Sequence, residues 1–155
     1  MREYRYVVDR EGRIFHDGTE IIDPPLLRFF LLGMQQTEDR RYLVMCQGER
    51  NWFEAEDTPF VVQRLRCAAP DGRLLSVELQ LAGDHREALD PETLETEDDV
   101  FYCRVRRRAF RARFGRVAMQ QLAPFLIDAS DGPSLLLAGA RYPVRRLPGD
   151  APPRQ

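Results

Sequence analysis

Short strand-like runs with few helices between them limit this fold more than any other feature of the sequence. Apolar and polar residues alternate in brief stretches that Gly, Asp and Pro turn signals separate. Two stretches have the length and spacing of a helix. A parallel sheet of βαβ units needs a helix between most strands. We therefore expect the α+β class, with antiparallel sheets and two principal helices.

The first helix is predicted to begin at Asp23 and Pro24 and to run to about residue 36. The Asp23 carboxylate can accept hydrogen bonds from the free N–H groups of the first turn, and proline at the first helical position has no N–H to satisfy. This stretch is apolar on most sides, so we expect it in the core.

The order strand–strand–helix–strand–strand is predicted twice, which indicates a duplicated motif flanking a central hairpin. Together these parts are expected to form one domain over residues 1–145, followed by a disordered Pro- and Arg-rich tail over residues 146–155. The parts of the domain are the pseudo-repeats at about 3–55 and 100–145, the hairpin at about 58–81 and an acidic connector at 84–99.

Several signals bear on the compartment and the chemistry. The N-terminus is charged from its second residue, and the longest apolar run is interrupted by Arg28, well short of the ~18 residues that a membrane span needs. Cys46, Cys67 and Cys103 are odd in number and far apart, which argues against a disulfide framework or a zinc site. We expect a soluble, cytoplasmic protein with no membrane partner.

Sequence motifs for common enzyme chemistry are missing. The chain has no Walker loop, dinucleotide-binding glycine pattern, nucleophile elbow or His-rich metal motif. All 23 basic residues are arginine and the net charge is −2, so arginine-rich stretches are weak evidence for a nucleic-acid partner. We expect no cofactor and no metal, and we favour a non-enzymatic role.

A set of short motifs is spread over nearly the whole chain. Its residues are Tyr6-Val7-Val8-Asp9, Gly12, Phe15, Phe29-Phe30, Arg41-Tyr42, Cys46, Gly48-Glu49-Arg50-Asn51, Glu56-Asp57-Thr58-Pro59, Asp90-Pro91-Glu92, Leu94, Gly139 and Arg141-Tyr142-Pro143. This set resembles a small family found in bacteria and mitochondria, the uncharacterised UPF five-nine-eight group, and the segment from Cys46 to Pro59 is its most specific part. That family tends to carry a Tyr-His pair where this chain has Tyr102-Cys103, so a role for that histidine does not carry over.

The opening His16-Asp17-Gly18 with Ile21 and Asp23, and the segment from Glu56 to Phe60, are also similar to a second bacterial family of unknown function. The fold of that family is built from repeated motifs and has been discussed for ligand binding or signalling. The resemblance implies the same kind of fold here, in agreement with the predicted repeat. Neither family has an established activity.

The first candidate site is the predicted hairpin tip with Glu49, Arg50 and Asn51, together with Asp57. Carboxylates accept hydrogen bonds, an arginine can bind a carboxylate or phosphate with two parallel bonds, and an amide can do both. The alternative is ordinary turn chemistry, in which these residue types are common.

His16 beside Asp17 is a second candidate, as an acid/base pair at a loop. Adjacent residues on a strand face opposite sides, so the two side chains converge only if the turn bends them together. The structural alternative, a solvated or capping histidine, is favoured.

We expect a module that binds a small anionic ligand or a protein partner in a cleft between the two halves. The first alternative is a small enzyme that uses Glu49, Asp57 or a thiol of Cys46 or Cys103. The second is nucleic-acid binding through the arginines of residues 104–116, although the acidic connector is well placed to neutralise them. Pairing of exposed sheet edges would give a homodimer.

Overall fold

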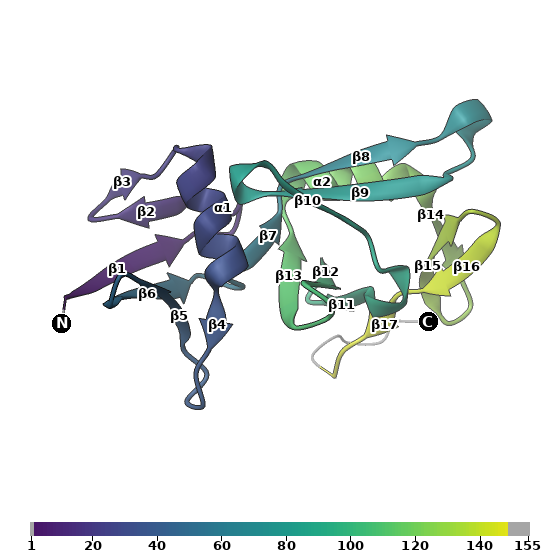
Figure 1. The fold of residues 1–155 in the computed structure, drawn as a ribbon. Helices are drawn as coiled ribbons and strands as arrows, with labels where there is room; N and C mark the ends of the chain where they lie inside the picture. Colours follow the sequence, from purple (N-terminus) through teal and green to yellow (C-terminus); the bar gives the residue numbers. More distant parts are fainter. Residues whose placement is uncertain (1, 149–155) are drawn as a thin grey trace.

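Two lobes lie side by side in the computed structural model, which describes residues 2–148 (Figure 1). The predicted α+β class is confirmed, since both helices pack on sheets that are mostly antiparallel. The N-terminal lobe consists of β1 (Glu3–Val8), β2 (Ile14–His16), β3 (Thr19–Glu20), α1 (Pro24–Gly33), β4 (Gln35–Gln36), β5 (Tyr42–Cys46) and β6 (Glu49–Ala55).

The second lobe contains the other described elements. Its strands are β7 (Phe60–Val62), β8 (Arg64–Ala68), β9 (Ser76–Leu81), β10 (His85–Ala88), β11 (Glu95–Glu97), β12 (Val100–Val105), β13 (Phe110–Phe114), β14 (Leu126–Ala129), β15 (Gly132–Leu137), β16 (Ala140–Pro143) and β17 (Arg145–Arg146). Its helical elements are η1 (Pro70–Gly72), η2 (Ala82–Asp84), η3 (Pro91–Thr93), α2 (Arg116–Leu122) and η4 (Ala123–Phe125).

The six strands of the N-terminal lobe form one sheet in the order β3-β2-β1-β6-β5-β4. Its central pair, β1 and β6, is parallel, with partners from Glu3 and Arg50 to Val8 and Ala55. The prediction of antiparallel sheets is therefore wrong for β1 and β6. Parallel neighbours need a long crossover between them, and α1 lies within that crossover.

Helix α1 covers one face of this sheet. The Phe30 ring lies 5.0 Å from both Tyr6 and Phe53, so one aromatic cluster joins helix and sheet. The helix ends at Gly33, three residues earlier than predicted, and Asp23 caps it without a side-chain hydrogen bond. The prediction of a carboxylate cap is wrong, because the Asp23 backbone carbonyl accepts from Leu27 N at 3.0 Å instead.

Helix α1 contributes to the core as expected, but only with one face. The helix lies on the sheet as a single layer, so only the face with Phe30 and Leu31 is buried. A stripe of apolar side chains stays exposed, one just before the helix begins and the others on its solvent side. Its members are Ile22, Leu26, Phe29 and Leu32.

The predicted hairpin at 58–81 is split at Gln63. On one side of this residue β7 pairs in parallel with β13, and on the other side β8 pairs with β9 in a different sheet. The acidic connector also forms strands, because β10 extends the β8–β9 sheet and β11 pairs with β12. Between these two strands Pro91–Thr93 forms the 3₁₀ helix η3.

The element order of the first half recurs as β12, β13, α2, β14, β15 and β16, but the pairing does not. In the N-terminal lobe the strands before and after the helix share one sheet. In the second lobe β12 and β13 belong to the sheet β17-β11-β12-β13-β7, whereas β14, β15 and β16 form a sheet of their own.

The predicted disordered tail begins too early. Arg145 and Arg146 form β17, which pairs in parallel with β11, and Leu147 N donates to the carbonyl of Thr96. Residues 149–155, the rest of that predicted tail, lie outside the described residues.

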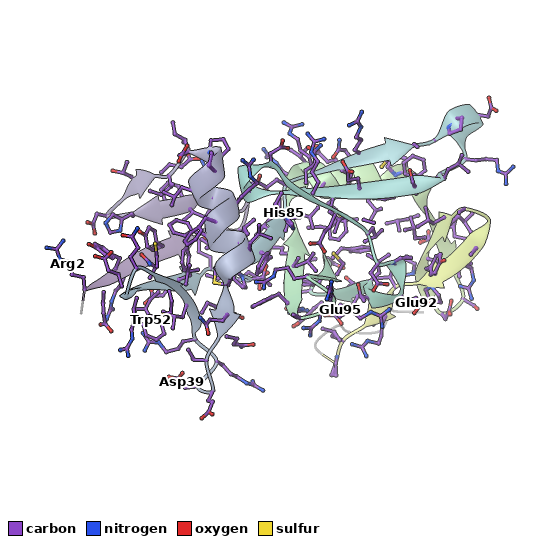
Figure 2. The ribbon with its side chains drawn as sticks, in the orientation of Figure 1. Arg2, Asp39, Trp52, His85, Glu92 and Glu95 are labelled. Atoms are coloured by element: carbon purple, nitrogen blue, oxygen red, sulfur yellow. The ribbon has the colours of Figure 1, made fainter. Side chains whose placement is uncertain are left out.

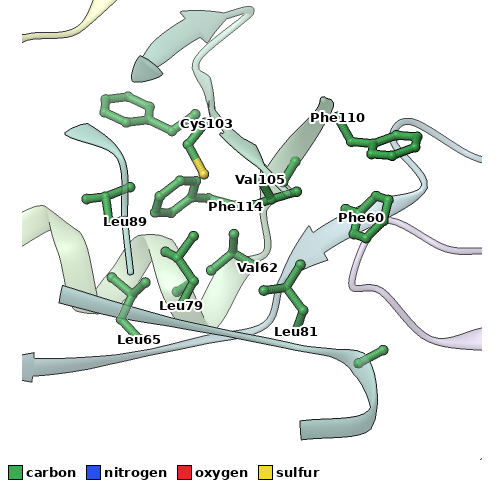
Figure 3. Close-up of a cluster of buried hydrophobic side chains, with 14 of the residues drawn as sticks. Phe60, Val62, Leu65, Leu79, Leu81, Leu89, Cys103, Val105, Phe110 and Phe114 are labelled. Atoms are coloured by element: carbon green, nitrogen blue, oxygen red, sulfur yellow. The ribbon is translucent and has the colours of Figure 1, made fainter. Parts of the chain in front are cut away.

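One cluster of buried side chains runs through both lobes. Figure 3 shows its central part, where β7, β9, β12 and β13 contribute inward-facing residues. Phe60, Leu79 and Ala112 are completely buried there, and the Phe60 and Phe110 rings lie 4.8 Å apart. Burial of this size is the main stabilising contribution to the fold.

The lobes meet at α1. Gly83 in η2 has φ +70°, and a Cβ atom on it would lie 2.5 Å from Arg28 N, so glycine is required for this approach. Arg28 donates in return to the Gly83 carbonyl at 2.9 Å. At the other end of the helix, Arg106 donates to the carbonyls of Leu31 and Met34 at 3.0 and 2.6 Å, which satisfies acceptors that a helix end leaves free.

Candidate functional site

The residues of the predicted hairpin site do not come together. Glu49 and Arg50 begin β6 and Asp57 follows its end, so roughly 20 Å of extended chain separates them. Asn51 is buried and donates to the Val44 carbonyl at 3.1 Å, which gives it a structural task. Arg50 lies on the surface, 3.4 Å from the carboxylate of Glu3.

Asp57 instead belongs to a polar network in the second lobe. Its Oδ2 accepts from Tyr102 Oη at 2.6 Å and from Arg113 Nη1 at 2.7 Å. Burial, helped by the bond to Asp57, raises the pKa of Tyr102 to about 12. The guanidinium of Arg111 covers the Tyr102 ring at 3.5 Å and pairs with Glu95 at 2.9 Å. Each charge here has a partner, so the network stabilises the sheet and leaves no group free for a ligand.

His16 and Asp17 do converge. Asp17 adopts φ 49°, and this turn brings its Oδ2 to 3.4 Å from His16 Nε2. The other ring nitrogen lies 3.0 Å from the Arg5 carbonyl, and the ring stacks near Tyr6 at 5.0 Å. The imidazole is thus held on the sheet, while the carboxylate is 89% exposed. The pair lies at the surface near the β2–β3 turn.

Two of the three thiols lie in settings that oppose nucleophilic chemistry. Cys103 is 1% exposed, and burial raises the pKa of its thiol far above the usual range. Burial also raises the pKa of Cys67. Cys46 is half-buried at the end of β5, away from both of them in the other lobe.

Part of the arginine-rich segment is paired with acids, and Arg108 and Arg111 bind the acidic connector as predicted. Arg108 binds Asp90 at 2.7 Å and Glu92 at 3.3 Å. Arg111 binds Glu95 and Glu97 in the same way. Arg106 is bound near the end of α1 and Arg113 to Asp57, so four of the seven guanidinium groups of residues 104–116 are engaged within the protein.

A different cluster of arginines surrounds Trp52 on the face of the N-terminal sheet that α1 does not cover. Trp52 is labelled in the N-terminal lobe in Figure 2. Trp52 lies in the centre of β6, and the register places Arg5 of β1 on one side of it. Arg40 and Arg41 enter from the turn between β4 and β5. A hollow of about 400 Å³ lies among these side chains, with Glu54 on its wall. We call it the Trp52 pocket.

The turn that supplies two of these arginines is well fixed. Thr37 N donates to the Arg41 carbonyl at 2.8 Å, and Arg41 N donates to the Thr37 hydroxyl at 3.0 Å. The hydroxyl in turn donates to Asp39. Arg40 takes the left-handed conformation, φ 64°, at the corner. The backbone therefore presents both side chains to the same pocket.

The charges of the Trp52 pocket are unsatisfied. Within residues 2–148, the side chains of Arg5, Arg40 and Arg41 make no ion pair and no hydrogen bond. The Arg41 guanidinium carbon instead lies over the Trp52 ring, 3.8 Å from its centroid, in cation–π contact. Glu54 offers one acceptor beside three cations. Guanidinium groups without a partner, next to an aromatic ring, can bind a small anion.

This cluster is not visible in the sequence, because Arg5 and Arg40 are 35 residues apart and sequence spacing does not reveal a parallel β1–β6 pair. The weak signal was Trp52 on the polar side of an alternating strand. The segment from Glu49 to Asp57 does contribute to a pocket, but through Trp52 and Glu54 and not through the four side chains predicted there.

Metal-binding clusters and membrane-spanning helices are absent from the described part of the chain. Within residues 2–148 there is no group of three or more His, Cys, Asp or Glu side chains arranged to hold a metal ion. In the same range no helix has the length and apolarity needed to cross a membrane.

Comparison with known proteins places the fold. No protein-family model matches the chain. A DUF1285 family protein from Silicibacter pomeroyi DSS-3 has a similar structure, with a TM-score of 0.68 and 18% identity over 92% of this chain and 82% of that one. A DUF1285 family protein from Shewanella baltica OS155 gives a TM-score of 0.55 and 17% identity, over 72% of this chain and 84% of that one.

These likenesses establish the fold and agree with the expectation of an uncharacterised domain of unknown function. They give no support to the UPF five-nine-eight group in particular. At such identities they carry no activity across, so the function has to be argued from the site itself.

Proposed function

We propose that this chain is a binding module for a small anion, which the Trp52 pocket holds through Arg5, Arg40 and Arg41. The observation that carries the proposal is that these three guanidinium groups line one hollow and have no acidic partner in the described chain. In the second lobe, by contrast, Arg108, Arg111 and Arg113 each bind an acidic side chain. Like charges kept together without a counter-charge cost free energy, and a bound anion removes that cost.

The side chains and the volume of the Trp52 pocket favour one class of ligand. Arginine binds carboxylate and phosphate groups with paired hydrogen bonds, and a volume of about 400 Å³ suits a compact molecule. The Glu54 carboxylate on the wall can accept from an N–H or O–H of the same ligand. A small phosphate or carboxylate compound that also carries a donor group fits the pocket best.

Trp52 provides a direct test, since it is the single tryptophan of the chain. Pyrophosphate, phosphate and citrate are titrated at constant ionic strength while Trp52 fluorescence is followed. We expect a saturable change with at least one of them, weakened about tenfold in Arg5→Gln and in Arg40→Gln. Arg64→Gln, an exposed arginine on β8, is the matched control and should leave the titration unchanged.

Two outcomes contradict the proposal: no saturable change with any of the three anions, or a change that is equal in the pocket variants and in Arg64→Gln. Native mass spectrometry of protein purified gently from its host adds an independent readout. A bound mass that is lost in Arg40→Gln identifies the natural ligand.

A protein-binding role is the second candidate, and the exposed apolar stripe of α1 favours it. Edge pairing is a weaker route to a homodimer, since β3 and β4, the edges of the N-terminal sheet, have two residues each. Light scattering on wild type and on Phe29→Glu tests self-association. A dimer that Phe29→Glu disrupts supports this role, and a monomer at every concentration removes the homodimer version.

A further inference from the structure

A second pocket lies at the far end of the molecule from Trp52, under the turn between β8 and β9 (right side of Figure 1). Its volume is about 350 Å³. Leu74 forms part of the lining and is itself buried, and η4 contributes Pro124 and Phe125. The facing wall comes from the sheet β14-β15-β16. We call it the Leu75 pocket.

The pocket keeps apolar side chains in contact with solvent. Leu75 is 50% exposed, Ile127 38% and Leu136 44%, and all three line it. Large apolar side chains scattered singly over a surface need no explanation, but three that surround one hollow mark a binding site. The Leu75 pocket is in this respect the opposite of the Trp52 pocket, where charged side chains form the wall.

The two walls are fixed to each other. Ala138 N, in the turn between β15 and β16, donates to the Leu74 carbonyl at 2.8 Å. On the other side, Leu75 N donates to Ala68 O at 2.7 Å and holds the strand against β8. The pocket therefore exists before any ligand enters, which reduces the entropy cost of binding.

A single positive charge lies in the lining. Arg73 belongs to the pocket, and its side chain makes no ion pair or hydrogen bond within residues 2–148. An apolar hollow with one free guanidinium group matches a molecule with an apolar body and one anionic end. A carboxylate fits that guanidinium with two parallel hydrogen bonds.

We propose that the Leu75 pocket binds a small amphiphilic carboxylate, with its alkyl body against Leu75, Ile127 and Leu136 and its carboxylate on Arg73. This site is independent of the Trp52 pocket. The full chain would bind a compact anion in the Trp52 pocket and an alkyl carboxylate in the Leu75 pocket. Neither ligand would compete with the other.

The probe is octanoate, with octan-1-ol as the neutral molecule of the same length. Binding is measured by calorimetry, and methyl NMR of the leucines and isoleucines locates it. We expect saturable octanoate binding that Arg73→Gln weakens about tenfold, as for the loss of a charge-assisted hydrogen bond. Arg66→Gln, an exposed arginine on the neighbouring β8, should leave it unchanged.

A second variant tests the apolar wall. Ile127→Glu places a carboxylate against the ligand and should abolish binding of octanoate, while thermal melting reports that the fold is retained, because Ile127 is exposed. No saturable binding, or binding that survives Ile127→Glu, overturns the site. Equal affinity for octan-1-ol, with no effect of Arg73→Gln, overturns recognition of the carboxylate.

Discussion

Gly83 of η2 lies against the first turn of α1, and the hydrogen bond from Arg28 Nη1 to the Gly83 carbonyl, 2.9 Å long, holds the two lobes together at that point. The contact leaves no room for a side chain on Gly83. Since the neighbouring atoms belong to the helix backbone, they cannot rotate away. A substitution at this contact should therefore lower the stability of the whole fold.

Gly83→Ala should lower the free energy of unfolding by at least about 2 kcal/mol, because the new Cβ meets backbone atoms and φ +70° is strained for alanine. Gly18→Ala is the matched control. Gly18 has φ +78° but open space around it, so its substitution should cost about 1 kcal/mol. Denaturant unfolding measures both, and equal losses would contradict the close packing.

Arg106→Met should destabilise the protein by about 2 kcal/mol, since it removes the donor that satisfies the carbonyls of Leu31 and Met34. The neighbouring Arg107 is exposed, and its side chain makes no hydrogen bond or ion pair in the described chain. Arg107→Met should be within about 0.5 kcal/mol of wild type. Similar unfolding midpoints for the two variants would argue against this role of Arg106.

Stability should fall as pH rises from about 10 to about 12, partly through Tyr102. Its pKa is raised in the folded state to about 12, so the unfolded chain loses this proton first. The contribution is fully present below the unfolded pKa of 10.0 and is lost as pH rises through the folded one. Tyr102→Phe removes the hydrogen bond to Asp57 and should show a shallower decline in urea unfolding over this range.

Cys103 should resist thiol reagents as long as the protein is folded. The side chain is 1% exposed and its pKa is raised by burial, so little thiolate is present and none is accessible. Maleimide labelling followed by peptide mass spectrometry should modify Cys46 and Cys67 first and Cys103 only after unfolding. Labelling of native Cys103 at the rate of Cys46 would restore the thiol-enzyme alternative.

Local structure was readable from the sequence where local rules decide it. The start of α1 follows from Asp23 and Pro24, because the preferences for the first helical positions involve neighbouring residues only. The end of α1 was placed three residues late, because apolar composition does not show where the last turn stops packing on a sheet.

The sequence did not predict which strands far apart in the chain pair with each other. The strand predicted through Gln63 changes sheets there, and an alternating pattern does not tell which neighbour a strand takes. The same limit applies to the candidate site. Arg5 lies beside Trp52 only because β1 and β6 pair in parallel. Arg50 and Asn51, which are close to Trp52 in the sequence, led to a predicted site whose residues lie apart in the structure.

The parallel pairing of β1 with β6 also sets an order of events on the ribosome. β1 is made early, but the strand that completes the middle of its sheet ends only at Ala55. Until then the growing chain presents an open strand edge, the kind of surface on which other chains pair. The contacts of Arg106 with α1 come later still. A nascent chain is thus most exposed to wrong partners while β2 to β5 leave the exit tunnel, and this interval is when a chaperone would protect it most.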